Sequence, residues 1–224
     1  MTLLAIDAST RNTGIAIYDG VQVLYECSWH SEQFHSVELA PAVELGLRRA
    51  GVGPKDLKAL AVAIGPGSYT GLRIGLALAK GLVFARNLAL VSVPTLDVLA
   101  QGQPVQDLPM AAVLQAGRGR LGVGWYHVAD GAWHASTPPE LLTAAELAER
   151  IQRPTYICGE LNEADRATVG RKYKNAVLAS PAWCLRRPAI LAEMGWQRWQ
   201  AGELSDPAGL SPKYLQASNA VPSE

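Results

Sequence analysis

The sequence predicts an α/β fold made of two lobes that share one order of elements. Short apolar runs, typical of strands buried on both faces, alternate with longer helical patterns. The series begins with three strands and starts again after the turn-forming stretch Gln101-Gly102-Gln103-Pro104. We therefore expect a first lobe over residues 1–103 and a second over 104–224, each with a mixed five-stranded sheet.

The first lobe is expected to open with three strands and to continue with alternating helices and strands. Apolar runs near 3–7, 13–18 and 21–28 predict the three strands. Helices are expected at 35–50, 71–86 and 95–102, and further strands at 59–64 and 88–93.

The second lobe repeats this order. Three strands are expected at 110–114, 121–128 and 132–135. Thr143 and Glu146 form a capping-box pattern, which predicts that a helix begins there. The remaining elements are a strand at 155–158, a helix after Gly159, a strand near 176–178 and a helix from about 187 to 201.

A glycine-rich segment, G-P-G-S-Y-T-G-L-R-I-G at 65–75, joins a buried strand to a helix. Exposed N–H groups at a helix N-terminus favour anions, so a phosphate cradle is one interpretation. However, the segment lacks the lysine of a P-loop and the G-x-G-x-x-G of a dinucleotide site. Ser68 also lacks the flanking glycines of a nucleophile elbow, because Pro66 and Thr70 take their places. The pattern therefore favours a structural turn.

The helix after this turn has two strips of very small residues. Each internal glycine costs about 1 kcal/mol relative to alanine, so the strips need a structural reason. Two reasons remain open, tight packing on the protein's own sheet and a subunit interface. The strips consist of Gly71, Gly75 and Ala79, and of Ala77, Gly81 and Ala85.

The segment at 65–75 resembles the signature of the TsaB (YeaZ) family of the bacterial tRNA threonylcarbamoyladenosine pathway. The opening L-L-A-I-D-A-S-T, H-S-V-E-L at 35–39, V-P-T-L at 93–96 and the closing P-K-Y-L at 212–215 are similar as well. The middle of the chain and residues 130–205 match in pattern alone. The resemblance implies actin-like (ASKHA, ribonuclease H-like) lobes and a non-catalytic paralogue of TsaD.

The resemblance also implies partners. Proteins of this family bind the transferase TsaD and, with the ATPase TsaE and ATP, support threonylcarbamoyl transfer to N6 of the adenosine beside the anticodon. We therefore expect a scaffold subunit that meets tRNA only through the complex and pairs with itself when alone. In the family, the first two long helices make the contacts. The residues expected at this interface are Leu39, Val43, Gly46, Gly71, Leu72, Gly75, Leu76 and Ala79.

In the fold that the resemblance implies, an aspartate at the end of the first strand commonly holds phosphate or metal. Asp7, with Ser9 and Thr10, is the weak nucleotide candidate here, and an Asx-type turn is the alternative. The family's second-lobe aspartate is replaced by Gln115, which has no carboxylate for magnesium. His35 lacks the second histidine of the H-x-x-x-H motif of TsaD, because Leu39 stands there. We therefore expect no catalytic residue, cofactor or metal.

The rival interpretation is an enzyme, either a small kinase-like ATPase or a peptidase. The ATPase would need a second carboxylate beside Asp7, and Gln115 argues against one. The peptidase lacks a Ser/His/Asp or metal constellation at recognisable spacing.

Charge and cysteine usage restrict the function further. The 224 residues have a formal net charge of zero, which disfavours tight tRNA binding by this chain alone. Three widely spaced cysteines suggest neither a disulfide framework nor a zinc site. The N-terminus lacks a signal-peptide pattern, so we expect a cytoplasmic protein without membrane contact. Basic clusters, which we expect on solvated faces, lie at 118–120, 171–174 and 186–187.

Overall fold

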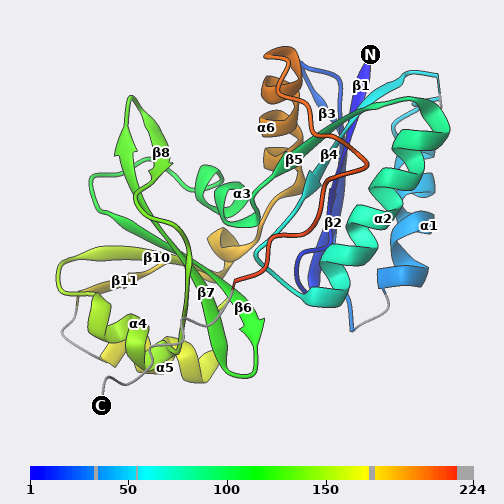
Figure 1. Cartoon of the computed structure of the whole chain (residues 1–224). Coiled ribbons are helices and arrows are strands. Elements are labelled where there is room, and N and C mark those ends of the chain that lie inside the picture. Colours follow the sequence, from blue (N-terminus) through cyan, green and yellow to red (C-terminus); the bar gives the residue numbers. More distant parts are fainter. Residues whose placement is uncertain (33–34, 54, 172–174, 216–224) are drawn as a thin grey trace.

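The computed structural model describes residues 1–32, 35–53, 55–171 and 175–215. Two mixed sheets form two lobes, and Figure 1 shows them at an angle to each other with the chain crossing between them more than once. No helix in the described part of the chain is long and apolar enough to cross a membrane.

The first sheet has five strands, as the sequence predicts, in the order β3-β2-β1-β4-β5. β1 pairs antiparallel with β2 and parallel with β4, so its residues are covered on both edges and both faces. This burial explains the continuous apolar run of β1. The bounds are β1 Thr2–Asp7, β2 Asn12–Tyr18, β3 Val23–His30, β4 Leu57–Ala63 and β5 Ala89–Val93.

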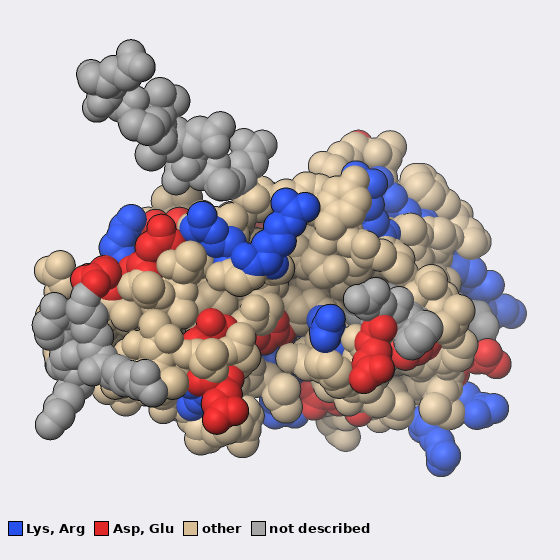
Figure 2. Space-filling view, turned by 90° about the horizontal axis from the view of Figure 1, so that it is seen from below, with Lys and Arg blue, Asp and Glu red and all other residues tan. Residues whose placement is uncertain are grey.

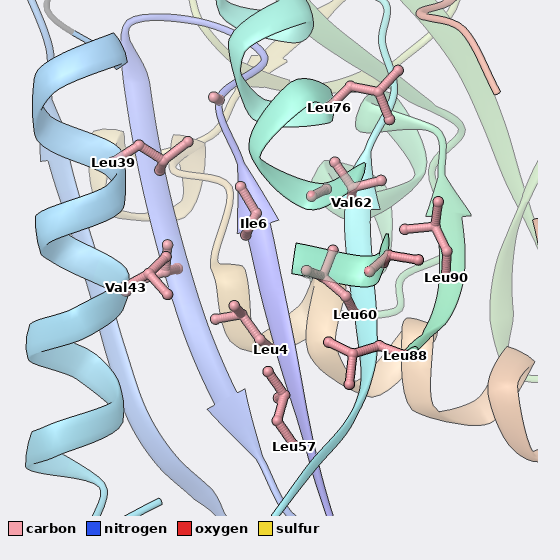
Figure 3. Packing of buried hydrophobic residues seen from close by; sticks show 14 of the residues in the cluster. Leu4, Ile6, Leu39, Val43, Leu57, Leu60, Val62, Leu76, Leu88 and Leu90 are labelled. Atoms are coloured by element: carbon pink, nitrogen blue, oxygen red, sulfur yellow. The ribbon is translucent and has the colours of Figure 1, made fainter. Parts of the chain in front are cut away.

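Two helices cover one face of this sheet, α1 (His35–Arg49) and α2 (Tyr69–Arg86). Figure 3 shows Leu39 and Val43 of α1 and Leu76 of α2 directed at the leucine, isoleucine and valine side chains of the strands. Asn87 directly follows α2 and takes a left-handed backbone conformation with φ 52°, which terminates the helix.

The opposite face of the first sheet is lined with small residues and is covered by α6 (Pro188–Gln200), with α3 (Thr95–Gln101) beside it. A Cβ atom on Gly195 of α6 would overlap the Cβ of Ala61 in β4, so this helix lies very close to the strand. Alanines in the strands and a glycine in the helix make that approach possible.

The second sheet has six strands, one more than expected. Its order is β11-β10-β6-β7-β8, and the additional strand β9 (Glu140–Leu142) pairs with β7. Three residues are too few to show a period in the sequence, although Leu142 of β9 is buried. The other bounds are β6 Met110–Gly117, β7 Arg120–Ala129, β8 Ala132–Ala135, β10 Thr155–Gly159 and β11 Ala176–Leu178.

The second lobe carries α4 (Ala144–Arg150) and α5 (Glu163–Arg171), followed by the short 3-10 helix η1 (Pro181–Cys184). The predicted capping box of α4 is confirmed. Thr143 accepts a hydrogen bond from the Glu146 N–H, and the Glu146 carboxylate accepts one from the Thr143 N–H.

The described residues after 187 return to the first lobe, which corrects the expectation that all of 104–224 builds the second lobe. Besides α6, the segment 203–215 follows the first sheet (Figure 1). The Ser205 N–H donates to the Leu90 carbonyl at 2.8 Å, and the Lys213 N–H donates to the Ile64 carbonyl at 2.7 Å. The physical reason is that the first 103 residues leave one face of their sheet partly uncovered. The division at residue 103 itself stays a prediction.

Candidate functional site

A cleft with a cavity of about 1250 Å³ lies between the two lobes. Thr10, Asn12 and the turn at 66–70 line it from the first lobe, and Gln115, Glu160 and other residues line it from the second. On the face shown in Figure 2, basic side chains lie beside acidic ones on both lobes. Because residues of both lobes line this cleft, it is the first place to look for chemistry.

Asp7 ends β1 at this cleft and takes part in a tight turn. Its Oδ1 accepts a hydrogen bond from the Ser9 N–H at 2.8 Å, as in an Asx-type turn. The Ser9 hydroxyl is fully buried and pairs with the Thr95 hydroxyl at 2.8 Å. Of the three nucleotide candidates, Ser9 is thus engaged inside the first lobe, while Asp7 and Thr10 meet a different partner.

That partner is Arg186, whose guanidinium lies between the two lobes. Its Nε donates to Asp7 Oδ2 at 2.8 Å, and its Nη1 donates to Glu160 Oε1 at 2.5 Å. Its Nη2 donates to the Thr10 hydroxyl and to the Asn12 carbonyl, both at 2.8 Å. We call these five residues the Arg186 clasp.

The clasp is almost entirely removed from solvent. The side chains of Arg186, Asp7 and Glu160 are 1%, 3% and 10% exposed. Burial alone would lower the pKa of Arg186, but the charges of Asp7 and Glu160 outweigh it and raise the pKa above its ordinary value. Arg186 therefore stays charged and holds both carboxylates in one place.

Two expectations about the clasp are wrong. The sequence predicts a solvated face for both Arg186 and Arg187, yet of the two only Arg187 is exposed, and it pairs with Glu26. The sequence also predicts no acidic partner for Asp7 in the second lobe, yet Glu160 provides a carboxylate on the same guanidinium. The sequence does contain a signal for Glu160. This acidic residue directly follows the buried strand β10, and side chains at the carboxyl ends of such strands emerge at the cleft.

Gln115 stands at the end of β6 and completes the second lobe's side of the cleft. Its N–H donates to Glu160 Oε2 at 3.3 Å, and its side-chain amide donates to Asp165 Oδ2 at 2.9 Å. The amide thus links the end of β6 to α5 and supplies no carboxylate, as the sequence indicates.

The glycine-rich segment is a structural turn against β1. A Cβ atom on Gly67 would overlap the Ser9 carbonyl oxygen, and the Ser68 N–H donates to that oxygen at 2.6 Å. The Ser68 hydroxyl accepts a hydrogen bond from the Gly71 N–H and so caps α2. These contacts favour the structural interpretation of the segment over a phosphate cradle.

The residues expected at the partner interface lie inside the chain's own core. Gly75 touches Ala8, and Gly46 is packed by Tyr25 and Ile15. This face of α1 and α2 covers the first sheet, so its residues are not exposed to a partner. The buried positions are Leu39, Val43, Gly46, Gly71, Leu72, Gly75, Leu76 and Ala79.

The second strip of small residues has the opposite orientation. Gly81 has nothing within 4 Å of an added Cβ, and Ala77 and Ala85 are exposed as well. Phe84, on the same side of α2, is 65% exposed. An interface on these helices would therefore use this outer face.

Three other sequence features complete the description. α1 begins at His35, but the His35 side chain lies outside the described part of the chain, as do Lys172 and Lys174 of one basic cluster. Among the described residues, no three His, Cys, Asp or Glu side chains gather closely enough to hold a metal ion. The cysteines Cys27, Cys158 and Cys184 are unpaired with one another.

Comparisons with known proteins agree with the fold and the motif. The family model for TsaD, tRNA N6-adenosine threonylcarbamoyltransferase, matches residues 30–174. The chain is 31% identical to the tRNA threonylcarbamoyladenosine biosynthesis protein TsaB of Bacillus subtilis, over 98% of this chain and 96% of that protein. It is 32% identical to TsaB of Escherichia coli over 68% of this chain and 67% of that protein.

Solved structures point the same way. YeaZ from Pseudomonas aeruginosa superimposes with a TM-score of 0.77 at 26% identity, covering 96% of this chain and 99% of the other. An activator of 2-hydroxyisocaproyl-CoA dehydratase from Clostridium difficile, solved with ADPNP, covers 92% of this chain and 99% of its own. Its TM-score of 0.54 at 10% identity shows the fold alone. The lobes thus have the actin-like (ASKHA) fold.

Proposed function

Because the chain belongs to the TsaB (YeaZ) family of tRNA threonylcarbamoyladenosine biosynthesis proteins, we propose that it is a non-catalytic scaffold subunit of that pathway. It binds a transferase of the TsaD type and supports transfer of threonylcarbamoyl to N6 of the adenosine next to the anticodon. TsaE with ATP joins the larger complex, and tRNA is reached only through that complex. The site of action is the cytoplasm.

The Arg186 clasp is the observation that carries the non-catalytic part of this proposal. A kinase-like ATPase needs carboxylates that are free to hold magnesium beside the phosphates of the nucleotide. Asp7 and Glu160 are instead both paired with one buried guanidinium, at 2.8 and 2.5 Å. Displacing that guanidinium would leave a charge unpaired in the interior, which is costly.

The outer face of α1 and α2 is the proposed surface for TsaD. The two helices lie side by side on the first sheet (Figure 1), and they expose apolar side chains next to the small residues of the second strip. Val37 and Phe84 are each 65% exposed, which is unusual for large apolar residues on neighbouring helices. Without TsaD, the same face would pair two copies of the chain. The proposed contact residues are Val37, Leu45, Ala77, Gly81, Phe84 and Ala85.

The experiment is to mix the purified chain with TsaD from the same organism and to measure the mass by light scattering during size-exclusion chromatography. We expect a stoichiometric complex for the wild type and for Val21→Glu, a control at an 82% exposed apolar residue in the β2–β3 turn. Phe84→Glu should abolish the complex, because it places a charge in the centre of the proposed apolar surface.

Separate peaks for the wild type under conditions that support tRNA modification would refute the scaffold role. Nucleotide binding by the free chain, measured by calorimetry with and without magnesium, would then favour the kinase-like ATPase. A complex that tolerates Phe84→Glu would keep the role and move the surface elsewhere.

A further inference from the structure

The Arg186 clasp joins parts of the chain that belong to different lobes. Asp7, Thr10 and Asn12 lie at the β1–β2 turn of the first lobe, and Glu160 follows β10 of the second. Arg186 comes from the connection that leads out of η1 and back to α6 on the first sheet. The clasp therefore crosses the cleft at its base.

Its position is the one where ligands of open α/β sheets usually lie. Asp7 ends β1 and Glu160 follows β10, so both carboxylates emerge at the carboxyl ends of strands, where crevices form. Two carboxylates that face each other across a crevice repel unless a cation separates them. In this chain the cation is a side chain of the protein itself.

The hydrogen bonds around the guanidinium explain how it can take the place of a bound cation between the two carboxylates. It donates to two carboxylates, one hydroxyl and one carbonyl, and the Thr10 hydroxyl in turn donates to Glu160 Oε1 at 2.6 Å. The Asn12 side-chain amide also donates to Glu160 Oε1, at 3.1 Å. Such a network fixes the direction of approach as well as the distance, because a planar guanidinium has its donors at set angles.

We propose that Arg186 is a built-in cation that holds the two lobes closed on each other, so that the interlobe angle needs no nucleotide or metal. The free chain then keeps one interlobe arrangement before any partner binds. This inference goes beyond the scaffold role, and it can fail while TsaD binding stands, since its test uses the free chain alone.

The test is amide hydrogen exchange, read by NMR or mass spectrometry, at amides on both sides of the cleft, with the Gln115 N–H reporting on the position of the Glu160 carboxylate. That N–H donates to the Glu160 carboxylate, so it exchanges faster when Glu160 moves away. Arg186→Met keeps an unbranched, largely apolar side chain, although a shorter one, and removes every donor. Arg187→Met is the matched control, because the neighbouring arginine also pairs with a glutamate but is 63% exposed.

A second variant separates the loss of the Arg186 contacts from the effect of leaving buried carboxylates unpaired. The triple substitution Asp7→Asn, Glu160→Gln and Arg186→Met removes the cation and both carboxylates together, so no unpaired charge is left inside. It also keeps the test available if Arg186→Met alone does not fold.

We expect amides at 8–13, at Gln115 and at 159–161 to exchange about tenfold faster or more in both Arg186→Met and the triple variant. Their radius of gyration from X-ray scattering should rise, and Arg187→Met should match the wild type in both measurements. Wild-type exchange at these amides in the triple variant would overturn the proposal. It would mean that the segment 203–215, which also bridges the lobes through Leu215 against Gly122, suffices to hold them.

Discussion

Gly75 of α2 lies against Ala8 beyond the end of β1, so close that a Cβ atom on the glycine would come within 3.1 Å of the alanine Cβ. The strip of small residues through Gly71, Gly75 and Ala79 thus exists to bring the helix onto the protein's own sheet. All three positions are buried. The cost of glycine in a helix interior is offset by the approach that it allows.

Gly75→Leu is therefore expected to damage the fold rather than only a partner surface. A leucine there has no room against Ala8 and Ile6, and overpacking of this kind costs about 1–3 kcal/mol or more. Urea unfolding followed by circular dichroism would measure the loss. An unfolding free energy equal to that of the wild type would show that α2 can shift outward without cost.

Gly81→Ala is the matched change on the outer strip of the same helix. Gly81 is exposed and an added Cβ meets nothing within 4 Å, so alanine should raise the unfolding free energy by about 0.5–1 kcal/mol through backbone entropy. The same unfolding assay reports the gain. A loss of stability would contradict the placement of this strip at the surface.

Arg186→Met should be among the most destabilising single changes in the chain. It leaves Asp7 and Glu160 buried without their cation, and breaking a buried pair in this way costs about 3–5 kcal/mol. Arg187→Met should cost less than about 1 kcal/mol, because its pair with Glu26 is exposed on the arginine side. Equal losses for the two variants in chemical denaturation would refute the assigned burial.

Asp7→Ala removes the acidic partner of Arg186 and tests whether Asp7 has a structural or a chemical role. The sequence suggests that this change has little effect on the activity of a complex, but the structure adds a stability cost, because Arg186 Nε loses its acceptor. We expect a lower midpoint of thermal unfolding and unchanged TsaD binding at a temperature where the variant is folded. Activity lost while an intact, folded complex persists would assign Asp7 a chemical role.

The stability of the second lobe should fall in alkaline solution because of Tyr126. Burial first, and then the charge of Asp97, raises the pKa of Tyr126 above its ordinary value of 10.0, and its hydroxyl donates to Asp97 at 2.8 Å. The folded state thus binds the proton more tightly than the unfolded state. This contribution is complete below pH 10.0 and is lost as the pH rises above that value.

Urea unfolding between about pH 8 and about pH 11 would measure this decline in the wild type and in Tyr126→Phe. The phenylalanine variant should be less stable near neutral pH, because Asp97 loses a donor, and should decline less steeply above pH 10.0. The buried thiol of Cys158 also has a raised pKa, which adds a decline common to both proteins. Parallel curves would contradict the role of Tyr126.

Much of the fold could be predicted from the sequence, because long apolar runs and helix patterns report burial directly. The strands around Leu4 and Leu60 and the helix after Ser68 are examples. The sequence does not predict β9, because three residues show no period. It places α6 in the second lobe, because a helical pattern does not say which sheet the helix covers.

The site was harder to predict than the fold, since it depends on contacts between residues far apart in the sequence. Arg186 is 179 positions from Asp7 and 26 from Glu160, so no local motif joins them. Arg186 and Arg187 also look alike in sequence, and only the path of the chain into α6 turns one inward and leaves the other in solvent. The same holds for the strip of small residues that contains Gly75. The spacing of these residues predicts that another element approaches closely, but it does not say which element.

The return of α6 to the first sheet has a consequence for folding during translation. Leu3, Ala61 and Val91 are made early, yet Leu191 and Ala192, which cover them, are made only after all strands of the second sheet. The nascent first lobe therefore has an open apolar face while the second lobe is being made, when a growing chain is prone to aggregate. A premature stop codon before α6 would leave the first sheet without the helix that covers this face.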